Sequence, residues 1–582
     1  MRTIEHPTGP LVSHDTPTRG IAVATHLLSI GAEQEAIALY ADLADRSGRL
    51  QLRARPKETA AAHISAARSQ RLSGNEGLAL QVLEVAAHLR VDAAIPFELA
   101  QTHTAMGRTH RALAMLDIAI GLDPDFREAH WERGALLERR GEVDAALDAW
   151  RKADAFRDPD RHSLCLVATL KSPRATNQSI FLANRDWARR HALQPDQWGP
   201  GRFPQWSAGE RINLAYTSSF WDAEVIRYQI LPFLRRHDRD RFTVTAYVRG
   251  NSGPHLGDAV DDIRFVGGMA DDAFVQQVRA DGMHILVELN GHSPGHRFAA
   301  MGARCAPIQV SYFNNIGTSG VEQIDYLLGD AISIPTRDDE FYTEQVYRLP
   351  RCFFCATYDP ADLPPVAPPP SLRNGYVTFG CFSSAGKINP ELVALWARML
   401  DRVPGSRFFI RNGDLTPPDN RDALARQFER HGIDRARLLI CPGTSRQGVL
   451  DSYAEVDIAL DTYPYCGGNT SAEALWQGVP VVTLTGDRFA TAYGAAVLVA
   501  SGLPELVAGT PEEYVSLAAG LAGNSSRLTF YRNNLRRMVM EHGFSNADTF
   551  TAMMDAAYLD MMIRRYEQHG PASPNRKRAH VS

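Results

Sequence analysis

DTYPYCGGNTSAEALWQGVPVVTLTG, residues 461–486, decides the fold of this chain. The apolar run before Asp461 predicts a strand that ends there, and VPVVTL predicts a second strand. Between the two, Gly467 and Gly468 allow a close approach of the backbone, and a helix is expected to begin near Asn469 or the next residue. A strand, a glycine loop, a helix and another strand in this order predict part of a parallel α/β sheet.

The junction between the glycine loop and the helix predicts a site for a diphosphate. At a helix N-terminus, unpaired backbone N–H groups and the helix dipole both favour negative charge. Thr470 and Glu473 have the T-x-x-E spacing of a capping box, which is expected to fix the start of the helix. The glycines by themselves fit an ordinary strand-to-helix junction, and the sequence contains no Walker motif.

Alternating strand and helix patterns extend from this stretch in both directions. We place one α/β lobe at 210–360, where INLAYTSS, FTVTAYV, HILVEL and PIQVSYF are the expected strands. A second lobe follows at 374–566, and the helices from 511 onwards are expected to complete it. The proline-rich segment 361–373 predicts a linker, because clustered prolines continue neither a helix nor a central strand. Two lobes joined in this way form a ligand cleft at the carboxyl ends of their strands.

Residues 20–160 contain an internal repeat with a period of 33 or 34 residues. Three copies keep five positions in register: Ala67, Gly74, Ala79, Leu83 and Ala86; Ala100, Gly107, Ala112, Leu116 and Ala119; Gly134, Gly141, Ala146, Trp150 and Ala153. A weaker fourth copy has Gly31, Ala36 and Tyr40. Small residues let the two helices of a hairpin pack closely and glycine makes the turn, so the pattern resembles the tetratricopeptide repeat. Such arrays usually hold an extended peptide or protein partner; alternatively, four short repeats only brace the neighbouring domain.

Length and composition exclude several other classes of protein. The 582 residues exceed one domain of roughly 150 residues, and 44% hydrophobic with 22% charged residues is typical of a folded chain. The net charge of −5 gives no basic field for nucleic acid. Seven sparse cysteines favour a reducing cytoplasm over a disulfide scaffold. The most apolar long stretch, 492–504, is too short to span a membrane.

The remaining segments carry weaker signals. We interpret 1–19 as a flexible tail, 161–209 as a connector between the repeats and the first lobe, and 567–582 as a second tail. Cys352 and Cys355 form a single CxxC, and no second cysteine pair or histidine cluster follows to complete a zinc site. We therefore expect no metal.

At these motifs the chain resembles glycosyltransferase family 41, which comprises the O-linked N-acetylglucosamine transferases and the SPINDLY-type protein O-fucosyltransferases. The resemblance runs from about 20 to 560 and rests on the order and spacing of RINLAYTSS, HILVELNGHSPGHR, APIQVSYFNNIGTSG, YRLPRCFFC, VTFGCFSSAGKINPELVALWARMLDRVPGS and DIALDTYPYCGGNTSAEALWQGVPVVTLTG. It implies an α-helical tetratricopeptide-repeat superhelix followed by an α/β GT-B catalytic region of two Rossmann-like lobes.

The resemblance also implies the activity. The repeats would recruit a protein acceptor, and the lobes would move a sugar, with inversion and without a metal or cofactor, from a nucleotide-sugar donor to Ser or Thr hydroxyls. UDP-GlcNAc and GDP-fucose are the leading donors. The resemblance places Lys387 at the donor diphosphate, which agrees with the need to stabilise a leaving diphosphate without metal. The residues implied for the rest of the donor site are Gly467, Gly468, Asn469, Thr470, Ser471 and Glu473.

The sequence departs from the family pattern at three places. Glu224 stands where the family usually carries a histidine, and it could accept a hydroxyl proton or be a solvated loop acid. Val449 stands near the position of the family histidine at the donor base and ribose, and Gly468 begins the loop that usually reads His-Thr-Thr. His292 and its neighbour His296 follow the HILVEL strand and are cleft candidates, although lone histidines are more often structural.

Two other functions fit the same sequence. Bacterial relatives with this layout glycosylate surface proteins such as flagellins, so a different nucleotide sugar is one alternative. The other alternative is an inactive scaffold, which the missing histidines would suggest. Lys387 together with the complete glycine loop disfavours a scaffold, because a scaffold has no need of that combination.

Overall fold

The computed structural model of the protein describes residues 56–89, 93–198, 201–251, 253, 255–542 and 544–566. The predicted tails and the weak fourth repeat copy at Gly31, Ala36 and Tyr40 lie outside these residues. The chain divides into two compact units. One holds the helices up to Leu136 together with 148–154 and 417–420, and the other holds 137–147, 155–416 and the rest of the chain.

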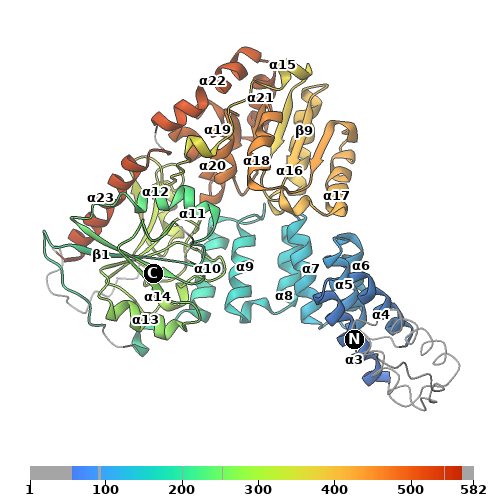
Figure 1. The fold of residues 1–582 in the computed structure, drawn as a ribbon, viewed down its shortest axis with the longest axis horizontal. Coiled ribbons are helices and arrows are strands. Elements are labelled where there is room, and N and C mark those ends of the chain that lie inside the picture. The colour runs from blue at the N-terminus through green and yellow to red at the C-terminus, as the bar shows by residue number, and fades with distance from the viewer. Residues whose placement is uncertain are drawn as a thin grey trace, which may run out of the picture. The chain divides into compact units, whose positions relative to one another are not determined.

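Helical hairpins form the N-terminal part of the chain (Figure 1). The helices are α3 (Pro56–Leu72), α4 (Glu76–Leu89), α5 (Ala94–Ala105), α6 (Thr109–Leu122), α7 (Arg127–Arg139) and α8 (Val143–Lys152). The three turn glycines, Gly74, Gly107 and Gly141, have φ of +79°, +69° and +77°, a conformation that favours glycine. A Cβ on Gly134 would lie 2.3 Å from Nε1 of Trp150. The hairpins and their buried small residues confirm the predicted repeats.

The first lobe is a seven-stranded parallel sheet with the order β3-β2-β1-β4-β5-β6-β7. Its strands are β1 (Ile212–Ser218), β2 (Phe242–Val248), β3 (Asp262–Phe265), β4 (Ile285–Glu288), β5 (Ile308–Ser311), β6 (Tyr326–Asp330) and β7 (Gln345–Leu349). Its helices include α11 (Glu224–Gln229), α12 (Leu231–Leu234), α13 (Asp271–Ala280) and α14 (Phe298–Met301).

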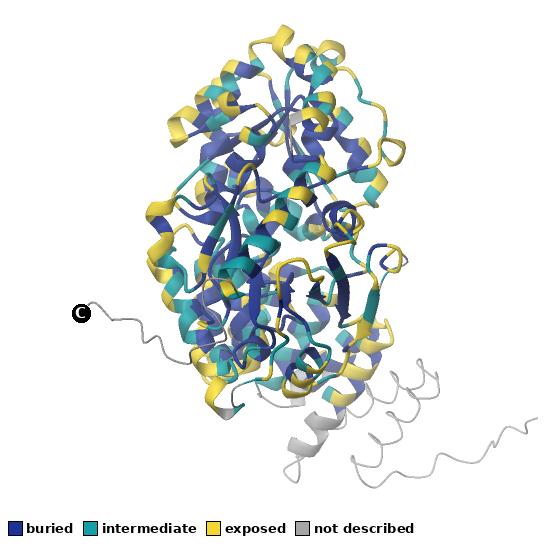
Figure 2. Ribbon diagram, turned by 90° about the vertical axis from the view of Figure 1, so that its left-hand side faces the viewer, coloured by how far each residue is buried: buried dark blue, intermediate teal, exposed yellow. Residues whose placement is uncertain are grey.

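The second lobe is a six-stranded parallel sheet with the order β10-β9-β8-β11-β12-β13. Its strands are β8 (Thr378–Cys381), β9 (Arg407–Arg411), β10 (Leu438–Cys441), β11 (Ile458–Leu460), β12 (Val481–Leu484) and β13 (Val507–Ala508). Its helices are α15 (Ser371–Asn374), α16 (Pro390–Arg402), α17 (Pro418–Glu429), α18 (Arg446–Ser452), α19 (Asn469–Trp476), α20 (Phe489–Ala500), α21 (Pro511–Ala522) and α22 (Ser525–His542). Figure 2 shows the strands buried beneath helices whose outer faces are exposed. Helical repeats followed by two parallel α/β lobes confirm the predicted fold class.

The last helix corrects the expected extent of the second lobe. We expected every helix up to about residue 566 to belong to that lobe, but α23 (Ala547–Tyr566) packs on α12, β5 and β7 of the first. The hydroxyl of Thr551 bonds to the Phe233 carbonyl oxygen at 3.3 Å, and the Tyr216 hydroxyl lies 3.1 Å from that of Tyr558. Apolar residues of α23, such as Met554 and Met561, are fully buried. The helix therefore completes the hydrophobic core of the first lobe.

The stretch 161–209 is also more than a connector. It begins inside α9 (Pro159–Thr169) and contains α10 (Asn177–His191). Leu166 and Trp187 of these helices are buried in one apolar cluster with Phe274 and Phe298 of the first lobe. The two helices therefore form part of the core of that lobe.

Candidate functional site

The glycine loop after β11 is folded around the carboxylate of Asp461. One oxygen accepts hydrogen bonds from the backbone N–H of Gly467 at 2.6 Å and of Thr462 at 2.8 Å. The other accepts from the Thr483 hydroxyl at 2.8 Å. A Cβ on Gly494 would lie 2.3 Å from this second oxygen, so glycine there makes room for the carboxylate. The sequence predicts Asp461 only as the end of a strand; its role in shaping the loop is seen only in the fold.

The helix after the loop begins as predicted, but its cap differs. Helix α19 starts at Asn469 with Gly468 at the N-cap, and no side chain caps it. The predicted capping box of Thr470 and Glu473 is therefore wrong. Glu473 instead forms an ion pair with the guanidinium of Arg446, which competes for the carboxylate. The helix start keeps the uncapped N–H groups that an anion site needs.

Lys387 lies beside this loop. It ends a short turn, Ala385–Lys387, between β8 and α16, and its ammonium group donates to the Cys466 carbonyl oxygen at 3.0 Å. The same nitrogen is 3.9 Å from the centre of the Tyr465 ring. Burial lowers the pKa of Lys387, and the nearby Asp461 carboxylate opposes this shift. The structure thus brings the predicted lysine and the predicted glycine loop together.

Arg446 joins the site from the start of α18. Its guanidinium lies 5.3 Å from the centre of the Tyr228 ring and 5.9 Å from that of Tyr358. Burial raises the pKa of the Glu473 carboxyl, whereas Arg446 lowers it. Sequence reasoning missed Arg446, because no local spacing connects it to Glu473 and only the fold brings them together.

Helix α11 extends from the first lobe to the same site. The Gln229 amide donates to the side-chain oxygen of Asn469. Glu224, at the start of the helix, is exposed. Burial and the neighbouring Glu224 carboxylate raise the pKa of the Tyr228 hydroxyl. Glu224 therefore stands at the outer edge of the residues that surround Arg446.

His292 has different neighbours from the other candidates. It is buried, its Nδ1 lies 3.2 Å from the Ser163 hydroxyl, and its ring centre is 4.8 Å from that of Trp187. His296 also contacts Ser163, at 3.0 Å. Burial holds the pKa of His292 well below the usual value. These contacts connect His292 to α9 and α10 rather than to Lys387.

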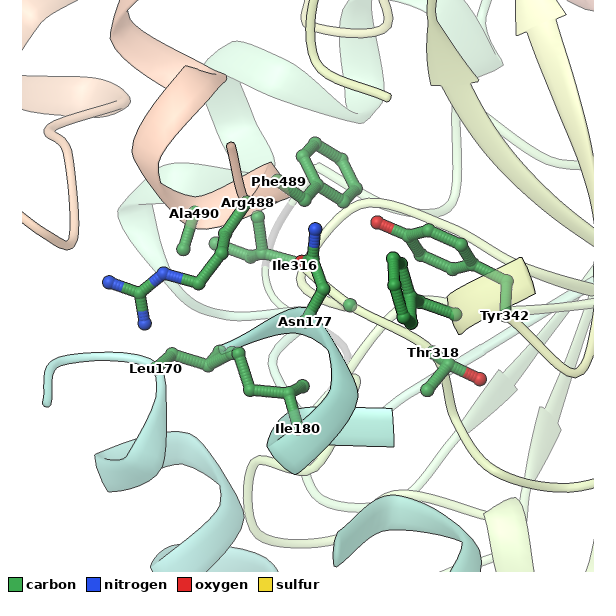
Figure 3. A pocket seen from close by; sticks show the side chains of 11 residues that line it. Leu170, Asn177, Ile180, Ile316, Thr318, Tyr342, Arg488, Phe489 and Ala490 are labelled. Carbon is green, nitrogen blue, oxygen red and sulfur yellow. The ribbon is translucent and has the colours of Figure 1, made fainter. Parts of the chain in front are cut away.

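A narrow pocket lies between α10, the loop after β5 and the start of α20 (Figure 3). Figure 3 shows the Arg488 guanidinium directed away from its interior, where it donates to the Ser172 carbonyl oxygen at 3.2 Å. The pocket holds about 10 Å³, room for little more than one water molecule. It is too small for a nucleotide sugar.

Neither a metal centre nor a membrane span is found within the described part of the chain. No group of three or more His, Cys, Asp or Glu residues there could hold a metal ion. Cys352 and Cys355 are buried free thiols. No helix of the described ranges is both long and apolar enough to cross a bilayer.

Comparisons with known proteins agree on one family. The model of glycosyl transferase family 41 matches residues 258–360 and 370–554. The probable UDP-N-acetylglucosamine–peptide N-acetylglucosaminyltransferase SPINDLY of Hordeum vulgare is 31% identical over 431 residues, 71% of this chain and 45% of that protein. The Arabidopsis thaliana SPINDLY is 32% identical over 66% of this chain and 43% of its own length. This chain thus spans less than half of these curated relatives.

One solved structure is similar over its whole length. A Lys-to-Met mutant of the Thermobaculum terrenum O-GlcNAc transferase is 31% identical, with a TM-score of 0.76. The similarity covers 89% of this chain and 100% of that one.

Proposed function

The chain belongs to glycosyltransferase family 41, and on that premise we propose that it transfers a sugar from a nucleotide-sugar donor to Ser or Thr hydroxyls of a protein acceptor. One observation carries the proposal. The ammonium of Lys387 donates a hydrogen bond to the carbonyl oxygen of Cys466. Cys466 directly precedes the glycine loop, which leads to the uncapped start of α19. A cation and free N–H groups at one point are what a leaving diphosphate requires.

The proposed chemistry is an inverting displacement. An acceptor hydroxyl attacks the anomeric carbon from the face opposite the diphosphate, and a C–O bond to the acceptor forms while the bond to the diphosphate breaks. The hydroxyl proton passes to solvent at the exposed edge of the site, and the nucleoside diphosphate leaves as the anion. Lys387 and the uncapped backbone N–H groups of 468–471 stabilise the negative charge that develops on the leaving group. The protein's own cation fills this role, so the proposal includes no metal.

Glu224 is the proposed contact to the acceptor hydroxyl. It is exposed at the start of α11, beside the aromatic residues that flank Arg446. A solvent-exposed carboxylate is a weak base, so we assign Glu224 the orientation of the hydroxyl rather than an essential proton transfer. The contacts of His292 favour a packing role over a chemical one.

UDP-GlcNAc and GDP-fucose are the proposed donors. The curated relatives are named as probable UDP-N-acetylglucosamine–peptide transferases, which supports the first. The helical repeats are proposed to recruit the acceptor polypeptide. Seven free cysteines support a reducing location such as the cytoplasm.

Nucleotide release from a panel of donors tests the proposal. Purified protein with UDP-GlcNAc, GDP-fucose and a CMP-sugar should release nucleotide from one of them and label a protein acceptor. Lys387→Ala should lose about 10²-fold or more of this rate with folding intact, whereas Lys152→Ala, which removes an exposed lysine, should not. Equal rates in Lys387→Ala and the unmodified protein would refute the assignment. A protein that releases no nucleotide from any donor would favour the scaffold.

A further inference from the structure

The turn that carries Lys387 is held by the last hairpin of the helical region. Gly141, in the turn between α7 and α8, has φ of +77°, and a Cβ there would lie 2.0 Å from the carbonyl oxygen of Ile388. A Cβ on Gly386 would lie 2.8 Å from a carboxylate oxygen of Glu138. Both sides of this contact thus lack a side chain where the two backbones meet, and the residues in contact flank Lys387.

Lys171 completes the contact. Its ammonium forms an ion pair with Glu138, and the two side chains are only 16% and 20% exposed. Only five of the chain's 62 basic side chains are lysines, yet two of them stand at this place. The charge of Lys171 also lies close enough to lower the pKa of Lys387, in addition to the larger effect of burial.

The segment after α9 connects the same hairpin to the second lobe. The hydroxyl of Ser172 donates to Asp144 of α8 at 2.5 Å. The Ser172 carbonyl oxygen accepts from Arg488, the residue before α20, at 3.2 Å. The hairpin is therefore joined to the second lobe at two points, one of them next to Lys387.

The turn is fixed on its other side as well. The backbone N–H of Ala385 donates to Asp414 at 3.0 Å, and the Asn389 amide donates to the Tyr463 carbonyl oxygen at 2.8 Å. Because the turn is held on both sides, it cannot move away as a whole when the hairpin changes. A collision on the hairpin side is therefore expected to displace the residues next to Lys387.

We propose that Gly141 and the ion pair between Glu138 and Lys171 are positioning residues for Lys387, so that the end of the helical region sets where the donor-binding ammonium stands. This inference rests on the proposed role of Lys387. A displacement of about 1 Å can cost about 10²-fold in rate, which is why the support of this turn matters for transfer.

The first test compares two glycines with the same backbone conformation. Gly141→Ala introduces a Cβ that collides with Ile388, whereas Gly74→Ala, at the equivalent turn of an earlier repeat, has the same strain with nothing within 4 Å. We expect faster amide exchange at 385–388 and at least a 10-fold lower kcat, with the acceptor KM within twofold, for Gly141→Ala. Gly74→Ala should leave the exchange at 385–388 unchanged. Equal exchange in both variants would overturn the proposal.

The second test removes the charge of Lys171 without a backbone change. Lys171→Met is compared with Arg174→Met, whose side chain is 81% exposed and pairs with Asp144. The readout is competitive labelling of Lys387 with acetic anhydride as a function of pH, followed by mass spectrometry of its peptide. The groups that act on Lys387 are Asp461, Lys171, Cys466 and Cys381.

Loss of the Lys171 charge should raise the labelling midpoint of Lys387 by about half a pH unit, and kcat should fall about 10-fold. Arg174→Met should change neither. If Lys171→Met behaves as Arg174→Met does, the ion pair between Lys171 and Glu138 has no effect on Lys387, and the proposal is wrong. Labelling and exchange are measured without a donor, so they test the positioning separately from the activity. If the protein is inactive on every donor but Lys387 still responds to Lys171→Met, the proposed function is refuted and the positioning is supported.

Discussion

Asp461 and Lys387 share one buried environment, and each alters the proton affinity of the other. The carboxylate shapes the glycine loop through backbone N–H groups and also favours the charged form of the lysine. Asp461 thus orders the loop that we propose as the anion site and favours the protonated form of the adjacent Lys387, although it is itself buried.

Asp461→Asn should move the alkaline limb of nucleotide release to lower pH. Asparagine keeps the oxygen that accepts from Gly467, but the negative charge beside Lys387 is lost, so the pKa of the lysine falls and its active, protonated form disappears at a lower pH. The check is the pH dependence of kcat for nucleotide release. Asp487→Asn, at an exposed position, serves as control; an unchanged alkaline limb in Asp461→Asn would contradict the pairing.

Arg446→Met should destabilise the protein. The change leaves the buried carboxylate of Glu473 without its partner, at a cost of about 3 kcal/mol. Urea unfolding of the single variants and of Arg446→Met combined with Glu473→Gln measures it, and the double variant should regain part of the loss. No difference in the unfolding midpoint between Arg446→Met and the unmodified protein would show that the pair adds nothing.

At the scale of elements, periodicity predicted most of the two sheets but not every partner. Lys387 and the glycine loop were predictable, because each lies in a continuous motif. Arg446 and Gln229 were not, since their contacts join segments more than twenty residues apart. Strands β3, β6, β7 and β13 were not among the expected strands. In β3, Arg264 and the exposed Phe265 leave no buried apolar run.

His162 of α9 and His296, which packs against that helix, should make stability depend on pH. His162, on α9, has its pKa lowered by burial to about 4, and His296, which contacts the same helix, to about 3. Both are neutral when folded, whereas the unfolded chain binds protons below about pH 6.5. Stability is therefore complete above that value and falls as the pH drops towards the folded pKa, by about 1.4 kcal/mol per pH unit per histidine.

Urea unfolding at pH 7.5, 6.5, 5.5 and 4.5 checks this dependence. His162→Gln should reduce the slope of the unfolding free energy against pH, between pH 6.5 and 4.5, by about 1.4 kcal/mol per pH unit. His110→Gln, at an exposed site, should leave this slope unchanged. Equal slopes in all three proteins would rule out His162 as a source of acid sensitivity.

At the scale of the whole molecule, the boundary between the two compact units falls within the last helical repeat and not at its end. The residues 137–147 belong to the compact unit of the two lobes, and they include Glu138 and Gly141. The boundary between the two compact units therefore lies inside the last hairpin and not after it.

Two truncations should separate those parts. Removal of 1–122 keeps α7 and α8, so nucleotide release should continue while transfer to the protein acceptor falls by at least about 10-fold. Removal of 1–160 also takes Glu138 and Gly141 and should abolish both. Full transfer to the native acceptor by the shorter truncation would show that the early repeats only brace the lobes.

The return of α23 to the first lobe determines when that lobe can be finished during synthesis. Its sheet ends at Leu349, but the surface around Tyr216 and Phe233 stays uncovered until 547–566 has left the ribosome, about 200 residues later. The second lobe, whose helices end at His542, has its complete sequence first. A nascent chain stalled before α23 should therefore show a protease-resistant second lobe beside a first lobe that still binds chaperones.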